Sequence, residues 1–124
     1  MKLQILVPQY KETEEVIKPL LDSIEVQQNV NLKNDIGVII VNDGTDIHLS
    51  QEFFNRYSFP IEYHLNEHKG VSATRNACMD YADAEYVMFC DCDDCFARFL
   101  DGRHYRGSFF GYACYCFGFA KHTC

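Results

Sequence analysis

The sequence predicts an α/β fold with a mostly parallel sheet. Three observations indicate it: short apolar segments recur along the chain, helical patterns separate them, and polar residues follow each apolar segment. Strands that alternate with helices are typical of parallel sheets, whose right-handed connections place helices on both faces. We therefore expect three layers, with the carboxyl ends of the strands sharing one edge of the sheet.

The first half of the pattern contains two strands and a helix. Residues 3–7 form an apolar strand that ends at Pro8, and Thr13 is placed to cap a helix. The apolar stripe of that helix consists of Val16, Ile17, Leu20, Leu21 and Ile24. Pro19 lies within the stripe, so the helix either begins later or kinks there. Residues 36–41 are apolar and mostly β-branched, which predicts a second strand.

Four further segments complete the predicted architecture. Residues 49–57 are weakly amphipathic, and residues 61–65 show the alternation of a strand. Residues 71–84 predict a helix, and residues 86–90 predict a fourth strand that is apolar throughout. Helices and strands therefore continue to alternate, as a parallel sheet requires.

Length and charge exclude several classes of protein. At 124 residues the chain is one domain at most. Its net charge of −7 argues against nonspecific binding to nucleic acid, which depends on Lys and Arg. No apolar run reaches the ~18 residues of a transmembrane segment, and the first apolar run is too short for a signal peptide. Seven cysteines without regular spacing predict reduced thiols, and we expect a cytoplasmic protein.

The composition changes at Cys95. Residues 1–94 hold 7 Lys and Arg against 17 Asp and Glu, a net charge of −10, whereas residues 95–124 hold 4 against 1, a net charge of +3. The second segment lacks Val, Ile, Met and Pro and is crowded with Phe, Tyr, Cys and Gly. We expect residues 1–94 to form the ligand-binding part. Residues 95–124 either cap the domain irregularly or, as we favour, are not the natural continuation of the gene, since a shifted reading frame would produce this bias.

The strongest sign of chemistry is the acidic end of the fourth predicted strand. Asp91 and Asp93 are two residues apart, so an extended backbone directs both carboxylates to the same side. Crowded carboxylates repel, and a hard divalent cation with a phosphate-bearing substrate would neutralise them. One alternative is an exposed acidic turn without a ligand. A thiolate zinc site built from the Cys and His residues from Cys90 onward is a minor alternative, because their spacing matches no familiar zinc motif.

Other polar groups fall at matching strand ends. Tyr10 offers a flat ring on which a base can stack, and Asn42 or Asp43 could read the polar edge of that base. Arg75 can bind phosphate oxygens, and the start of the third helix near Gly70 adds free N–H groups. Each group also has a structural interpretation: a boundary aromatic, a common turn, or an exposed arginine paired with a neighbouring acid. Their joint position at one sheet edge favours a binding site.

Four motifs follow one another along residues 1–94. Residues 5–12 read ILVPQYKE, residues 38–46 read VIIVNDGTD, residues 70–76 read GVSATRN, and residues 86–94 read YVMFCDCDD. Together they resemble the inverting family 2 glycosyltransferases of the GT-A fold. The corresponding motifs of that family are Pro-x-Tyr-Asn-Glu, Val-Asp-Asp-Gly-Ser, Gly-x-x-x-x-Arg-Asn and Asp-x-Asp-Asp, in the same order.

The resemblance implies a Rossmann-like GT-A three-layer sandwich that binds a nucleotide-sugar donor, usually a UDP-sugar, with Mn²⁺ or Mg²⁺. Carried over by position, the nucleotide-sugar site would consist of Pro8, Tyr10, Glu12, Asn42, Asp43, Gly70, Arg75 and Asp91. Asp91 and Asp93 would be the metal ligands, and the metal would stabilise the departing diphosphate. An acceptor hydroxyl would displace the diphosphate with inversion, assisted by a general base.

The chain departs from the family's pattern in three places. Asn42 stands where the family usually has Asp, which makes a preference for uracil less secure, and Lys11 stands in place of Asn. The family's catalytic base and acceptor-binding region follow the Asp-x-Asp motif, whereas residues 95–124 contain no Glu. We therefore expect a sheet that is incomplete on its carboxyl-terminal side and a missing acceptor half.

The sequence therefore allows both an active and an inactive transferase. Its acceptor could be a glycan, a lipid or a protein. One alternative to an active transferase is a noncatalytic nucleotide- or metal-binding module. Another is a structural fragment, and an unfinished sheet would expose a strand edge that favours self-association.

Overall fold

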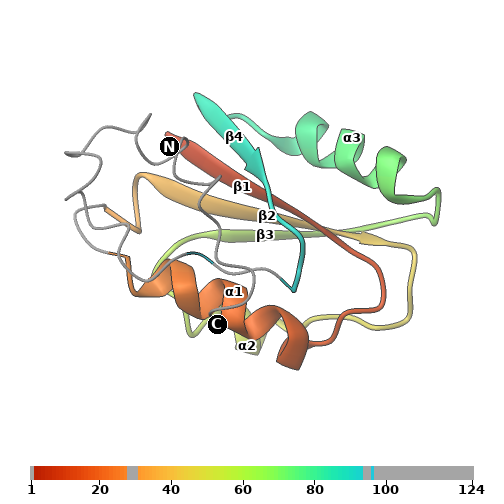
Figure 1. Cartoon of the computed structure of the whole chain (residues 1–124), viewed down its shortest axis with the longest axis horizontal. Coiled ribbons are helices and arrows are strands. Elements are labelled where there is room, and N and C mark those ends of the chain that lie inside the picture. Colours follow the sequence, from red (N-terminus) through yellow and green to blue (C-terminus); the bar gives the residue numbers. More distant parts are fainter. Residues whose placement is uncertain (1, 28–30, 94–95, 97–124) are drawn as a thin grey trace.

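The computed structural model describes residues 2–27, 31–93 and 96. Within them, helices and strands follow one another in the predicted α/β order (Figure 1). The elements are β1 (Leu3–Gln9), α1 (Glu14–Glu25), β2 (Ile36–Asp43), α2 (Gln51–Phe54), β3 (Ile61–Asn66), α3 (Val71–Tyr81) and β4 (Tyr86–Phe89). The predicted boundary at Cys95 and, apart from Phe96, the segment that follows it lie outside the described residues.

The four strands form one sheet in the order β3-β2-β1-β4, and every pairing is parallel. β1 pairs with β2 from Leu3 opposite Ile36 to Gln9 opposite Asn42, and with β4 starting at Leu3 opposite Tyr86. Because all strands run in one direction, the segments that follow them meet at the same edge. The predicted parallel α/β sheet is confirmed.

Apolar side chains pack on both faces of the sheet. Figure 1 shows α1 and α2 on one face and α3 on the other. Leu3, Ile5 and Val7 of β1 belong to the same apolar cluster as the buried residues of α1 and α2. Leu6 instead packs with Cys78 of α3, since successive side chains of a strand point to opposite faces. Full burial of a leucine such as Leu6 stabilises the fold by about 1.5–3 kcal/mol.

The first helix tolerates a proline in its interior. α1 begins directly after Thr13 and continues through Pro19, so the alternative of a later start is wrong and the alternative of a kink stays a prediction. Pro19 is exposed, and its missing N–H leaves the Glu15 carbonyl on a side of the helix that water can reach. Thr13 occupies the cap position, but its side chain makes no capping hydrogen bond in the described part of the chain. Packing of the apolar stripe therefore outweighs the local cost of the proline.

Two helices are shorter than the sequence pattern predicts. α2 spans only Gln51–Phe54, and the hydroxyl of Ser50 accepts a hydrogen bond from the N–H of Phe53 at its start. α3 ends at Tyr81 because Ala82 is already extended. None of the helices in the described ranges has the length and apolar character needed to cross a membrane.

Candidate functional site

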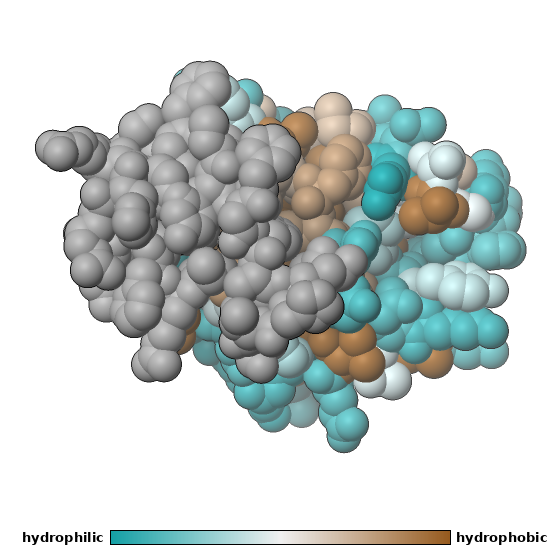
Figure 2. Space-filling view, viewed as in Figure 1, coloured by the Kyte–Doolittle hydropathy of each residue, from teal (hydrophilic) through white to brown (hydrophobic). Residues whose placement is uncertain are grey.

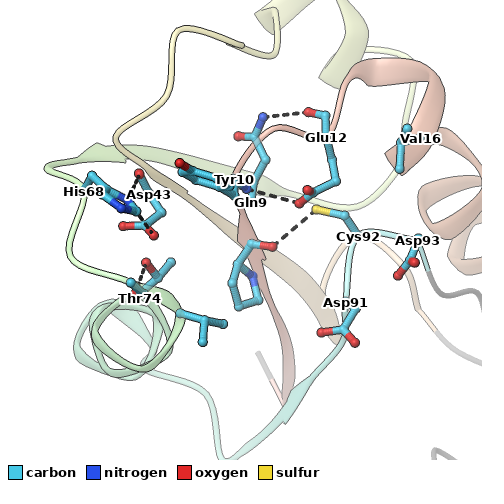
Figure 3. A pocket seen from close by; sticks show the side chains of 13 residues that line it. Gln9, Tyr10, Glu12, Val16, Asp43, His68, Thr74, Asp91, Cys92 and Asp93 are labelled. Atoms are coloured by element: carbon cyan, nitrogen blue, oxygen red, sulfur yellow. Dashed lines mark hydrogen bonds and ion pairs between the residues drawn. The ribbon is translucent and has the colours of Figure 1, made fainter.

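A cavity of about 460 Å³ opens at the carboxyl edge of the sheet (Figure 3). Its walls are formed by the ends of β1 and β2, by the segments that follow β1, β3 and β4, and by the first turns of α1 and α3. The predicted site residues that line it are Pro8, Tyr10, Glu12, Asp43, Gly70, Asp91 and Asp93. Asn42 and Arg75 are not in the lining. The parallel register thus brings most, but not all, of the predicted residues together.

Asn42 lies behind the cavity wall and connects the surrounding loops. It is 1% exposed, and its amide nitrogen donates to the Ile47 carbonyl and to the Tyr63 hydroxyl, each at 3.1 Å. Its Oδ1 accepts a hydrogen bond from the N–H of Thr45 at 2.7 Å. The Tyr63 hydroxyl in turn donates to Gln9 Oε1 at 2.8 Å, which joins this turn to the end of β1. Direct contact of Asn42 with a base stays a prediction.

Asp43 is the buried carboxylate of the site, with a side chain 7% exposed. Its Oδ1 accepts a hydrogen bond from the N–H of Lys69 at 2.9 Å, and its Oδ2 lies 3.2 Å from Nδ1 of His68. Burial alone would raise the pKa of Asp43, but hydrogen bonds from Lys69 and Thr74 and the nearby His68 outweigh it and lower that pKa below its ordinary value. The cavity therefore contains a carboxylate that is ionised at neutral pH.

Tyr10 supplies an aromatic wall. The residue is 41% exposed, and its ring stacks on His68 with centroids 5.1 Å apart and planes inclined by 29°. The ammonium of Lys11 lies 5.2 Å from the Tyr10 ring centroid. The Tyr10 N–H donates to Glu12 Oε1 at 3.1 Å, which ties the two predicted residues together. An exposed flat ring in a cavity wall is suited to stacking on a base.

Asp91 and Asp93 follow β4, and both are exposed. Figure 3 shows their carboxylates on one side of this segment and Cys92 on the other. The buried Cys92 thiol donates to the Pro8 carbonyl oxygen at 3.3 Å. Burial, and next the negative charge of Glu12, raise the pKa of Cys92. The thiol therefore stays protonated and anchors the segment that carries the two carboxylates.

The acidic pair fits a hard divalent cation. Carboxylate oxygens are the ligands that Mg²⁺ and Mn²⁺ prefer, and Asp91 and Asp93 present theirs at the same cavity. In residues 2–27, 31–93 and 96, no group of three or more His, Cys, Asp or Glu side chains could hold a metal ion unaided. A cation at Asp91 and Asp93 would have to take its remaining ligands from elsewhere, for example from phosphate oxygens and water, and the metal site stays a prediction.

Arg75 lies beside the cavity and pairs with one of these acids. Its Nη2 is 3.6 Å from Oδ1 of Asp91, and both side chains are half exposed. Its guanidinium carbon lies 5.7 Å from the ring centroid of Phe89. An exposed ion pair of this kind contributes about 0–1 kcal/mol to stability. The pairing matches the structural interpretation of Arg75, and its contact with a nucleotide stays a prediction.

Several lining residues were not among the predicted site residues: Gln9, Val16, His68, Val71, Thr74 and Cys92. Thr74 and Cys92 lie inside the motifs, but their residue types also suit a packed core. His68 precedes Gly70 by two positions, and no local pattern singles it out. It is identified by its contact with Asp43, 25 residues earlier, which only the folded chain reveals.

The family assignment follows from a comparison with known families. The model of "Glycosyl transferase family 2" matches residues 4–105. The chain belongs to glycosyl transferase family 2. The matched range includes all four motifs, so the predicted family is confirmed. It also extends beyond Cys95, and the proposed division at that residue stays a prediction.

Curated members of the family match the chain over about three quarters of its length. The glycosyltransferase GlyA of Streptococcus pneumoniae serotype 4 is 34% identical over 96 residues, which cover 75% of this chain and 13% of GlyA. An uncharacterized glycosyltransferase of Haemophilus influenzae is 35% identical over 95 residues, which cover 76% of this chain and 30% of that protein. The chain therefore spans less than a third of the length of these relatives.

Solved structures share the fold. TarS of S. aureus, residues 1–349 in complex with UDP, superposes with a TM-score of 0.66 at 26% identity over 79% of this chain and 29% of the TarS chain. The same region of TarS in complex with UDP-GlcNAc gives a TM-score of 0.63 at 27% identity, covering 79% and 28%. A mannosyltransferase of Pyrobaculum calidifontis with GDP-Man and Mn²⁺ has the same fold, with a TM-score of 0.63 at 23% identity over 78% and 29%. The predicted GT-A fold is confirmed.

Proposed function

We propose that this chain is the donor-binding part of a glycosyltransferase that transfers a sugar from a nucleotide sugar, in the first instance a UDP-sugar, to a hydroxyl acceptor with inversion. The observation that carries the proposal is the convergence of an aromatic ring, a buried carboxylate and an acidic pair on one cavity. A nucleotide sugar offers a base for the ring and a diphosphate for a cation at the acidic pair. Membership of the family and the UDP complex of TarS support this donor class.

The nucleoside end is assigned to the wall that contains Tyr10 and Asp43. The Tyr10 ring would stack on the base, and the ionised Asp43 would accept a hydrogen bond from an N–H of the base or a ribose hydroxyl. Pro8 and Glu12 shape this wall, since Glu12 holds the Tyr10 main chain. Asn42 would affect binding of the base indirectly, because it accepts the N–H of Thr45 and so holds the turn that follows Asp43.

The diphosphate end is assigned to the start of α3 and to the segment after β4. Gly70 is the N-cap residue of α3 and provides no side-chain cap in the described part of the chain, so the first N–H groups of the helix would suit an anionic group. Asp91 and Asp93 would hold Mn²⁺ or Mg²⁺, which when bound supplies Lewis-acid stabilisation of the leaving diphosphate. Arg75 would orient Asp91 and add positive charge close to the phosphates.

The transfer itself would follow the geometry of a displacement. The acceptor hydroxyl would attack the anomeric carbon opposite the diphosphate and form the new glycosidic bond, while the bond from that carbon to the diphosphate oxygen breaks and the nucleoside diphosphate leaves. The hydroxyl proton would pass to a general base. We assign that base to none of the described residues, because Glu12 and Asp43 already hold the donor wall and Asp91 and Asp93 serve the cation. The acceptor is proposed by class only, as a hydroxyl of a glycan, lipid or protein.

Calorimetric titration of UDP tests the donor site. The full chain should bind UDP in the presence of Mn²⁺, and a chelator should weaken this binding strongly, because the cation would neutralise Asp91 and Asp93 next to the diphosphate. Absence of UDP binding with either Mn²⁺ or Mg²⁺ would contradict the assignment.

A substitution at Asp93 tests the metal role. Asp93→Ala should weaken Mn²⁺-dependent UDP binding by roughly tenfold or more, because supporting groups of a metal site are already worth about 10–100-fold. Asp80→Ala is the matched control, since Asp80 is an exposed aspartate near the far end of α3 and should leave the affinity unchanged. If Asp93→Ala binds UDP as tightly as the unaltered chain, the metal role is wrong.

A noncatalytic nucleotide- or metal-binding module is the second candidate function. It is favoured by the fact that every residue assigned above serves the donor or its cation. Incubation of the full chain with UDP-GlcNAc and Mn²⁺ separates the two functions. Release of UDP by hydrolysis or transfer would support the enzyme, whereas metal-dependent binding without release would support the module.

A further inference from the structure

The stacked rings of Tyr10 and His68 lead beyond the motifs of the family. We propose that His68 is a positioning residue that holds the Tyr10 ring as a preformed wall for a nucleobase. The inference rests on the proposed function, because the wall serves recognition only if a nucleotide binds in this cavity. It assigns a role to a side chain that lies between two motifs and to which neither motif gives one.

The main chain of Tyr10 is fixed, but hydrogen bonds do not fix its ring. The N–H donates to Glu12 at 3.1 Å, and the carbonyl oxygen accepts a hydrogen bond from the hydroxyl of Thr45. The residue is 41% exposed, and its own hydroxyl makes no hydrogen bond with the described residues. Such a side chain has several staggered rotamers available. A further contact is needed to hold the ring in one orientation.

His68 provides that contact and is itself held in place. Its ring stacks on Tyr10 with centroids 5.1 Å apart (Figure 3). Nδ1 of His68 lies 3.1 Å from the carbonyl oxygen of Asp43 and 3.2 Å from its Oδ2. Both of these oxygens are acceptors, so Nδ1 carries a hydrogen. This requirement holds for the neutral and the protonated ring, and Asp43 therefore orients His68 in either form.

The anchor of this arrangement is the end of β2. The carboxylate of Asp43 is buried and also accepts the N–H of Lys69, which fixes the main chain next to His68. Gly44 has φ +75°, and a Cβ at this position would lie 2.3 Å from the main-chain nitrogen of His68. Glycine therefore permits both the turn and the close approach of the two segments. A continuous series of contacts runs from the sheet through Asp43 and His68 to the Tyr10 ring.

A ring that is already held in place loses less conformational entropy when a ligand binds to it. Ordering a free side chain opposes association, and preorganisation removes that cost. The benefit applies only to a ligand that stacks on the ring. Loss of His68 should therefore lower the affinity for a ligand that contains a base. It should leave the affinity for the diphosphate alone unchanged.

The experiment combines a double-mutant cycle with two probes. UDP and inorganic pyrophosphate are titrated calorimetrically, in the presence of Mn²⁺, into the full chain and into His68→Ala, His68→Phe, Tyr10→Ala and the double variant. We expect His68→Ala to weaken UDP binding by about two- to tenfold, the range of one aromatic pair, and to leave pyrophosphate unchanged. His68→Phe should recover most of the loss because it keeps a flat ring. Without Tyr10, removal of His68 should have no further effect.

Three results would overturn the inference while UDP binding by the unaltered chain is intact. They are an unchanged affinity of His68→Ala for UDP, an equal loss for pyrophosphate, and additive losses in the double variant. Failure of the unaltered chain to bind UDP would instead overturn the proposed function and the inference with it. Circular dichroism of each variant shows whether it is folded, and His68→Phe supplies the decisive comparison if His68→Ala is not.

Discussion

Asn42 donates hydrogen bonds that an aspartate in the same place could not. Its Nδ2 donates hydrogen bonds to the Ile47 carbonyl and the Tyr63 hydroxyl. That hydroxyl in turn donates its own hydrogen to Gln9. A carboxylate has no hydrogen to donate, and at 1% exposure its second oxygen would face these oxygens without a hydrogen between them. The departure from the family's usual Asp therefore matches the partners that this chain places around position 42.

Asp43 should make the protein sensitive to acid. The folded chain holds the pKa of Asp43 below the ordinary value of 3.8, so the unfolded chain binds this proton more readily. The stability that Asp43 contributes is present above that ordinary value and is lost as the pH falls through the lower folded pKa. Asp43→Asn should remove this part of the acid sensitivity and lower the free energy of unfolding at neutral pH by about 1–3 kcal/mol. Urea denaturation at a series of pH values measures both effects.

Asp46→Asn is the control for this prediction. Asp46 is exposed and lies in the segment that follows β2, only three positions from Asp43. We expect this variant to keep the acid sensitivity and the neutral stability of the unaltered chain. Equal acid sensitivity in Asp43→Asn and Asp46→Asn would show that Asp43 does not contribute.

At the scale of elements, Pro19 locally lowers the stability of α1. Replacement with alanine restores an N–H that can donate to the Glu15 carbonyl and adds the best helix former. We expect Pro19→Ala to raise the free energy of unfolding by about 1–3 kcal/mol, with part of the gain offset by a more flexible unfolded chain. Thermal and urea denaturation measure the change.

An exposed position in the same helix provides the comparison. Glu15→Ala also introduces alanine into α1, but it restores no hydrogen bond, and we expect a change within about 0.5 kcal/mol. Equal stability of Pro19→Ala and the unaltered chain would mean that α1 has already adapted to its proline, for example by a kink at this position.

At the scale of the whole molecule, we expect the outer strands of the sheet to govern contacts with other chains. β3 and β4 lie at the two edges of the described sheet. Figure 2 shows hydrophilic side chains over much of the described surface in this view, with apolar patches between them. Leu65 of β3 is 57% exposed, and Tyr86 and Phe89 of β4 are 37% and 40% exposed. Apolar residues at a strand edge favour association.

Self-association through a sheet edge is therefore retained as a prediction. Sedimentation velocity at increasing concentrations of the full chain should show a growing fraction of larger species. Leu65→Lys places a charge on the outer strand β3 and should reduce that fraction if β3 is the edge involved. A single monomeric species at every concentration would contradict the prediction.

The sequence by itself was sufficient for the order and type of the elements. Apolar runs and helical stripes are local patterns, and they placed β1, β2, β3 and β4 close to their observed positions. The motifs at the strand ends also predicted a shared edge, because parallel strands can only end on one side. Helix ends were less well predicted: α3 ends early because the chain is extended from Ala82, and the next two N–H groups donate to Gln4 of β1, a partner about 80 residues away.

Only the tertiary structure decided which polar side chains face the cavity. Asn42 and Asp43 are neighbours in β2, so they point to opposite faces of the sheet. Asn42 hydrogen-bonds to Tyr63 of β3 and holds the surrounding loops. Asp43 contacts His68 and lines the cavity. A strand's pattern shows that its side chains alternate. The register of the neighbouring strands and the long-range partners determine which of the two side chains lines the cavity and which holds the surrounding loops together.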